Sequence, residues 1–137
     1  MKPKPRNEES AQLFQQDLEH LLDQRQPLYK LANELPWEAL EKDFEGYYSK
    51  IGRPALPTRL MAGLLLLKQL ENLSDERVCE AWSRDAYMQY FCGESHFQWK
   101  PPCEPSELVH FRHRIGQQGV EKILRMTDDR RAARRQS

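Results

Sequence analysis

A set of basic and hydrogen-bonding side chains recurs at helical spacing towards the C-terminal end of the sequence. The set comprises His110, Arg112, His113, Arg114 and Gln117. All but Arg112 follow one another at i, i+3, i+4 and i+7 and so share one side of a helix, with Arg112 on its flank. Arginine pairs with guanine and glutamine with adenine in the DNA major groove, and histidine contacts bases or phosphates. These five residues are therefore a candidate DNA-binding site, although an ordinary solvated helix face has the same composition.

Two cysteines and two histidines form a second group with potential chemistry. Cys92, Cys103, His110 and His113 are all residue types that bind zinc, but their spacing lacks the close cysteine pair of a zinc finger. We therefore expect no metal site and interpret the cysteines as buried or unused thiols. The start of the chain, MKPKPRNEES, has no apolar segment typical of a secretory signal, so reduced thiols in a cytosolic protein are expected.

The common enzyme motifs are missing from the sequence. It contains no glycine-rich phosphate loop, no Gly-x-Ser-x-Gly elbow and no His-Glu-x-x-His pair. Metal-dependent phosphoryl transfer needs converging carboxylates that hold two ions about 4 Å apart. The 21 acidic residues are instead scattered over the expected helix surfaces. We therefore expect no catalytic residue and no cofactor in this chain.

The apolar residues that must position the candidate site recur with helical spacing almost throughout the chain. This pattern predicts an all-α fold, a compact multi-helix domain. The most apolar helix is expected over residues 58–70, where apolar side chains cover so much of the circumference that the helix must be central to the core. They are Leu60, Met61, Leu64, Leu65 and Leu67.

A helix-turn-helix-like arrangement is expected directly after this central helix. Asn72 can adopt the left-handed conformation that a tight helix exit requires, and Ser74 suits the N-cap of the next helix. Asp75 and Glu76 would then lie at the positive end of that helix dipole. Helix, short turn and helix is the spacing of a helix-turn-helix motif.

Shorter elements are expected on the N-terminal side and after the motif. Apolar stripes predict helices over residues 10–25 and from Pro36, and glycine and prolines predict an ordered connector over residues 47–57. Residues 87–105 read as a loop whose many aromatic side chains should pack onto the core.

The candidate DNA-binding residues lie on a helix that is expected to begin at Pro105 and end at Gly116. Its buried stripe would consist of Leu108, Phe111 and Ile115. The apolar pattern is lost after Leu124, which predicts an irregular or disordered basic tail. The domain boundaries expected are an N-terminal helix over 1–26, a helical DNA-binding domain over 27–124 and the tail over 125–137.

Charge is distributed unevenly along the chain, although the formal net charge is zero. Residues 105–137 carry eight lysines and arginines against four acidic residues, which places the surface facing DNA phosphates in this last quarter. The longest apolar run, residues 60–67, is far shorter than the roughly 18 residues of a membrane span. A bacterial cytoplasmic, nucleoid-associated protein with no membrane partner and no small-molecule substrate is expected.

Three stretches of the sequence closely resemble the amino-terminal region of transposases of the insertion sequence five family. Together they cover most of the chain, and their combination of motifs is highly specific. They are PLYKLANELPWEALEKDFEGYYS (27–49), GRPALPTRLMAGLLLLKQLENLSDERVCEAWSRDAYMQYFCGESHFQ (52–98) and PPCEPSELVHFRHRIGQQGVEKIL (101–124).

The resemblance implies a helical domain that recognises the terminal inverted repeats of an insertion sequence in double-stranded DNA during transposition. In complete members a catalytic domain follows, whose Asp-Asp-Glu triad binds two divalent metals, usually Mg²⁺. No position here matches that triad, so no catalytic residue is carried over and no activity of the chain alone is expected. After Leu124 the sequence RMTDDRRAARRQS departs from the family pattern, which predicts truncation before the catalytic domain.

A different class of function is also compatible with the sequence. The chain could be a protein-interaction module whose helix 58–70 and aromatic loop pack against another copy or a full-length transposase and inhibit it. An inert remnant that barely folds is a further alternative.

Overall fold

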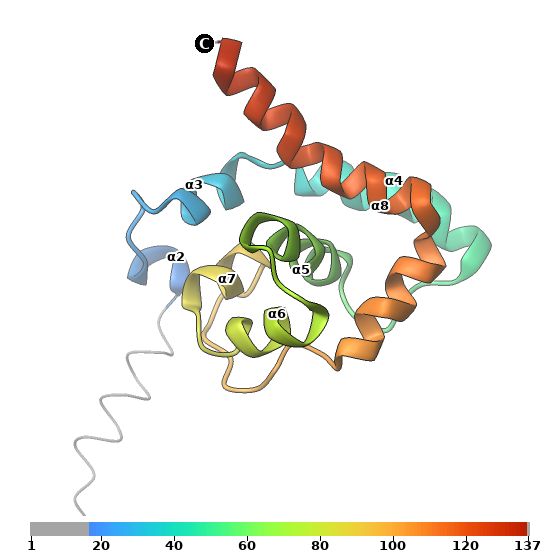
Figure 1. Cartoon of the computed structure of the whole chain (residues 1–137), viewed down its shortest axis with the longest axis horizontal. Coiled ribbons are helices and arrows are strands. Elements are labelled where there is room, and N and C mark those ends of the chain that lie inside the picture. The colour runs from blue at the N-terminus through green and yellow to red at the C-terminus, as the bar shows by residue number, and fades with distance from the viewer. Residues whose placement is uncertain (1–16, 137) are drawn as a thin grey trace, which may run out of the picture.

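The computed structural model describes residues 17–136, with side chains described for residues 17–130. Within this part of the chain every regular element is an α-helix, which confirms the predicted all-α fold (Figure 1). The helices are α2 (Leu18–Leu21), α3 (Pro27–Glu34), α4 (Trp37–Ile51), α5 (Thr58–Glu71), α6 (Asp75–Trp82), α7 (Ala86–Phe91) and α8 (Pro105–Gln136). None of these described helices is long and apolar enough to cross a membrane.

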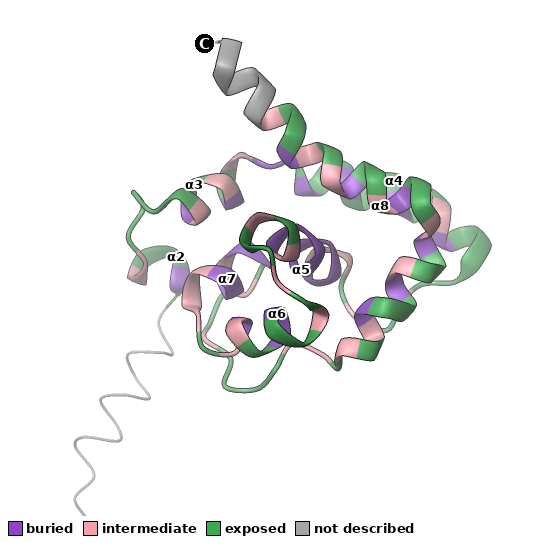
Figure 2. Ribbon diagram, in the orientation of Figure 1, coloured by how far each residue is buried: buried purple, intermediate pink, exposed green. Residues whose placement is uncertain are grey.

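Helix α5 lies at the centre of the fold, as its composition predicts. Every residue from Leu60 to Leu67 is buried, Gly63 included, and α4, α6 and α8 all contact this helix (Figure 2). Burial of this apolar stretch removes a large area from water and contributes strongly to the stability of the domain. The leucines thus pack inside this chain, so they do not offer the docking surface considered for a protein-interaction module.

The turn between α5 and α6 follows the sequence prediction closely. Asn72 has the left-handed conformation (φ 54, ψ 54) that ends α5. The Ser74 hydroxyl then accepts a hydrogen bond of 3.1 Å from the Arg77 backbone N–H and so caps α6. Satisfying a free N–H at a helix start in this way stabilises a helix by about 1 kcal/mol.

Aromatic contacts join the N-terminal helices to α7. Tyr29 and Tyr90 stack with ring centroids 4.6 Å apart, and Trp37 meets Phe91 edge-on at 5.3 Å. Tyr90 and Phe91 therefore pack onto the core as expected, whereas Trp99, further along the same segment, is exposed. The first part of this aromatic segment is not a loop, however, because Asp85 accepts hydrogen bonds from two backbone N–H groups and begins helix α7.

Two other boundaries differ from the prediction. Helix α4 continues to Ile51, well into the expected connector, because Tyr48 is buried and its hydroxyl lies 2.6 Å from that of Thr58. The helix expected over residues 10–25 is helical only at Leu18–Leu21 in the described part, and Ser10 and Phe14 lie outside the described residues.

Helix α8 differs most from the expectation. Gly116 (φ 72, ψ 178) ends the first helical segment, as predicted, but a second segment follows it directly, and α8 changes direction between the two (Figure 1). The second segment stays helical to Gln136, so the irregular tail predicted from residue 125 is wrong for residues 125–136. Ile123 and Thr127 are buried, and Arg130 forms an ion pair with Glu34 at 3.0 Å, which holds this segment against the body.

Candidate nucleic-acid interface

The first segment of α8, residues 105–115, is fixed by its apolar side. Leu108, Phe111 and Ile115 are all at most 3% exposed, which confirms the predicted buried stripe. This segment belongs to a three-helix unit in which α5, α6 and α8 contact one another pairwise. Burial of one side leaves the opposite side of the segment facing solvent (Figure 2).

His110 and His113 lie on this outward side. Both are exposed, and among the residues that the structure describes neither forms a hydrogen bond or an ion pair. An imidazole that forms no hydrogen bond within the protein can donate or accept one, according to its tautomer. These two side chains are therefore available to an external ligand.

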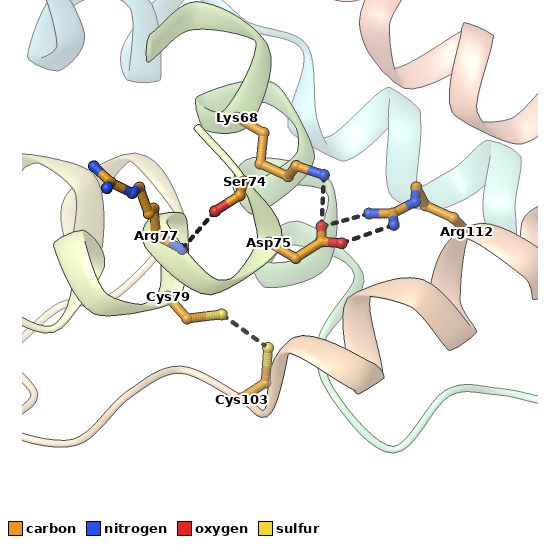
Figure 3. A network of polar contacts seen from close by, with 7 residues as sticks. All are labelled: Lys68, Ser74, Asp75, Arg77, Cys79, Cys103 and Arg112. Atoms are coloured by element: carbon orange, nitrogen blue, oxygen red, sulfur yellow. Dashed lines mark hydrogen bonds and ion pairs between the residues drawn. The ribbon is translucent and has the colours of Figure 1, made fainter. Parts of the chain in front are cut away.

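Arg112 points instead towards α6. Its Nη1 donates to Asp75 Oδ1 at 2.7 Å and its Nη2 to Asp75 Oδ2 at 2.9 Å, a two-pronged pair (Figure 3). Lys68 Nζ of α5 lies 2.5 Å from Asp75 Oδ1. One carboxylate thus joins all three helices of the unit.

The Asp75 carboxylate is strongly stabilised in its ionised form. Hydrogen bonding by Arg112, and to a smaller degree by Lys68, lowers the pKa of Asp75 to about 2 against an opposing effect of burial. The same hydrogen bond raises the pKa of Arg112. Arg112 and Lys68 share this single carboxylate, so the partly buried cluster retains one positive charge.

Arg114 contacts the end of α4. Its Nη2 donates to the carbonyl oxygens of Ile51 at 2.9 Å and Gly52 at 2.6 Å. The last carbonyls of a helix lack partners within the helix and carry partial negative charge, so a guanidinium here is favourable. Arg114 is nevertheless exposed, and its remaining surface faces solvent.

Gln117 lies beyond the break at Gly116. The helical spacing that would place it on the same face as His110 and His113 does not continue through a residue with φ 72 and ψ 178. Its side-chain amide donates to Glu121 at 3.2 Å within the second segment. The five candidate residues therefore do not form the single face that the spacing predicts, and their role in DNA binding stays a prediction.

Two further cations lie next to the contact made by Arg114. Lys50 and Arg53 are exposed and flank Ile51 and Gly52 in the sequence. Arg53 also forms an ion pair with Glu45 and lies over the Tyr48 ring, 5.8 Å from its centroid. Neither residue belongs to the helical pattern from which the site was predicted, because they lie at a helix end and in a connector; the two basic residues on either side of Gly52 were the available signal.

The four residues considered for zinc are not brought together. Among residues 17–136 no group of three or more His, Cys, Asp or Glu side chains is placed to hold a metal ion. Cys92 is enclosed in the core, and burial raises its pKa far above the ordinary thiol value. Cys103 instead approaches Cys79 of α6, with their sulfurs 4.0 Å apart (Figure 3).

Comparisons with known proteins place the chain among transposase domains. The family described as "Transposase domain (DUF772)" matches residues 16–114. The chain is also 41% identical over 125 residues to a protein of Rhizobium meliloti named "Uncharacterized protein ORF8 in nfe locus". That alignment covers 91% of this chain and 60% of the relative. No solved structure matches the chain significantly.

Proposed function

This chain belongs to the Transposase domain (DUF772) family, and from that membership we propose that it binds DNA in transposition. The proposed ligand is double-stranded DNA at the terminal inverted repeats of an insertion sequence of the insertion sequence five type. The proposed surface is the outward side of the first α8 segment, with the end of α4 beside it. Family membership carries the proposal, and the exposed side chains on this segment give it a location.

The arrangement of the three-helix unit supports this location. A helix that packs on two others through one apolar stripe and presents polar side chains outward has the form of a DNA-recognition helix. His110 and His113 are exposed on that side, and Lys50 and Arg53 add positive charge beside Arg114. Base contacts would specify the sequence while cations next to them hold the phosphates.

The contacts divide the candidate residues into two roles. His110 and His113 are proposed to contact DNA directly. Arg112, held by Asp75, is proposed to position the segment, and Arg114 to join it to α4 while offering its exposed side to a phosphate. Gln117 is proposed to reach the DNA only where the duplex extends past the break at Gly116.

A gel-shift titration with an inverted-repeat duplex across a salt series tests the proposal. We expect His110→Ala combined with His113→Ala to weaken binding by about tenfold or more, since base contacts contribute about 1–3 kcal/mol each. Arg25→Ala is a matched control, because the connection between α2 and α3 lies away from the first α8 segment (Figure 1). Equal affinity for a scrambled duplex would contradict specific recognition, and affinity independent of salt would contradict phosphate contacts.

One observation favours a second candidate function, binding to another protein. Trp99, in the connection between α7 and α8, is 69% exposed, and large exposed aromatic side chains are frequent at interfaces. We propose a full-length transposase, or a second copy of this chain, as the partner in that case. Size-exclusion chromatography of the chain, alone and with a full-length transposase, tests it: association that Trp99→Ala abolishes would support this role.

A further inference from the structure

Cys79 and Cys103 form a pair of thiols at the corner where α6 meets the start of α8. Their sulfur atoms are 4.0 Å apart and point towards each other (Figure 3). The ion pair between Asp75 and Arg112 joins the same two helices. A covalent bond at this corner would therefore reinforce a contact that the fold already makes.

The surroundings of the two sulfurs allow the gap to close. A disulfide needs a sulfur–sulfur distance of about 2.05 Å, so the two atoms must approach by about 2 Å. Cys79 is fixed on α6 and buried, but Cys103 lies in the irregular stretch that follows Pro101 and Pro102 and precedes α8. Rotation of its side chain together with a small shift of this stretch supplies the movement.

Solvent reaches the pair from one side. Cys103 is only half-buried, whereas Cys92 is enclosed in the core, where a Cβ built on Gly63 would come within 2.7 Å of its sulfur. Cys79 and Cys103 are thus an accessible pair of thiols, whereas packing keeps the third thiol, that of Cys92, away from them. Contact with the Cys103 thiol also lowers the pKa of Cys79, which favours the reactive thiolate form there.

We propose that Cys79 and Cys103 are a redox-sensitive modification site that forms a reversible disulfide between α6 and the start of α8. A two-electron oxidant such as hydrogen peroxide converts one thiol to a sulfenic acid and releases water. The second sulfur then attacks that sulfur, the S–O bond breaks, and the departing hydroxide takes the second thiol proton to form water. Two thiols and one peroxide thus give one disulfide and two waters. The proposal goes beyond DNA binding and does not depend on it.

Mild peroxide treatment of the full chain, followed by alkylation and intact-mass spectrometry, tests this site. With alkylation carried out in denaturant, which exposes the buried Cys92, we expect a monomer that has lost two hydrogens and carries one alkyl group, on Cys92, and dithiothreitol should restore three alkylated thiols. The oxidised chain should melt roughly 10 °C higher than the reduced chain, because the bond closes a long loop of the unfolded chain.

Single variants identify the residues involved. Cys79→Ala and Cys103→Ala should each abolish both the mass loss and the rise in Tm, whereas Cys92→Ala should retain both. If Cys79→Ala does not fold, Cys103→Ala still tests the proposal, because Cys103 lies outside the core helices. Three alkylated thiols after oxidation, a disulfide that includes Cys92, or a disulfide-linked dimer instead of the monomer would each overturn the proposal.

Discussion

Arg112 on α8 and Asp75 at the first position of α6 form a two-pronged ion pair with nitrogen–oxygen distances of 2.7 and 2.9 Å. Thirty-seven positions separate the two residues in sequence. The residue that looks most suited to read a base is thus occupied within its own domain. Its partner, Asp75, lies in the first turn of α6, where a negative charge also interacts favourably with the helix dipole.

This pair should contribute measurably to stability. We expect Arg112→Ala and Asp75→Asn each to lower the free energy of unfolding by about 1–3 kcal/mol, because each leaves a partly buried charge without its main partner. Urea unfolding of both single variants and the double variant should give a coupling energy of about 1 kcal/mol or more. Arg84→Ala is the control, since its pair with Glu80 is more than two-thirds exposed and should contribute less than about 0.5 kcal/mol. A coupling energy near zero would contradict this account.

The same pair predicts sensitivity to acid. The pKa of Asp75 is about 2 in the folded chain and returns to its ordinary value on unfolding. The ionised carboxylate therefore stabilises the fold fully when the pH is above that ordinary value. This stabilisation is lost as the pH falls towards 2. With screening by solvent, the stability difference between the wild type and Asp75→Asn should shrink by about 1 kcal/mol between pH 6 and pH 3. Urea titrations at pH 6 and pH 3 measure this change. A stability difference that is the same at both pH values would contradict a contribution of the low pKa of Asp75 to stability.

DNA affinity separates a positioning role of Arg112 from a direct one. If Arg112 positions the helix, Arg112→Ala and Asp75→Asn should weaken binding to an inverted-repeat duplex by similar factors, about tenfold or less. If Arg112 contacts DNA itself, Asp75→Asn should instead preserve or strengthen binding, because it releases a cation. Fluorescence anisotropy with a labelled duplex distinguishes the two results, and the Arg84→Ala variant again serves as the control.

Local signals in the sequence were enough to predict the central part of the fold. The run from Leu60 to Leu67 can only be buried, and the helix exit at Asn72 and the cap at Ser74 depend on residues within a few positions of each other. The inward stripe of the first α8 segment was equally visible, because periodicity over ten residues determines it.

What depends on distant partners could not be predicted. Nothing near Arg112 in the sequence points to Asp75, and nothing near Arg114 points to the carbonyl groups of Ile51 and Gly52. The helical tail was missed for a related reason: its apolar pattern is sparse, and its helix is held by contacts such as that between Arg130 and Glu34. Tertiary contacts override weak local preference in such segments.

Gly116 supports the most direct test of the shape of α8. Its φ of 72 and ψ of 178 belong to a region that essentially only glycine occupies, and a Cβ there would touch nothing. Gly116→Ala should therefore destabilise the fold by about 1–3 kcal/mol through the backbone alone. It should also weaken DNA binding if the angle between the two α8 segments shapes the interface.

Gly46 gives the matched control, since it lies inside α4 and a Cβ there would also touch nothing. Gly46→Ala should stabilise the chain by about 0.5–1 kcal/mol, because alanine loses less backbone freedom than glycine when a helix forms. Urea unfolding of the two variants should thus give shifts of opposite sign for the same chemical change. If Gly116→Ala also stabilised the chain, the break would not be a feature of the native helix, and α8 would run straight past residue 116.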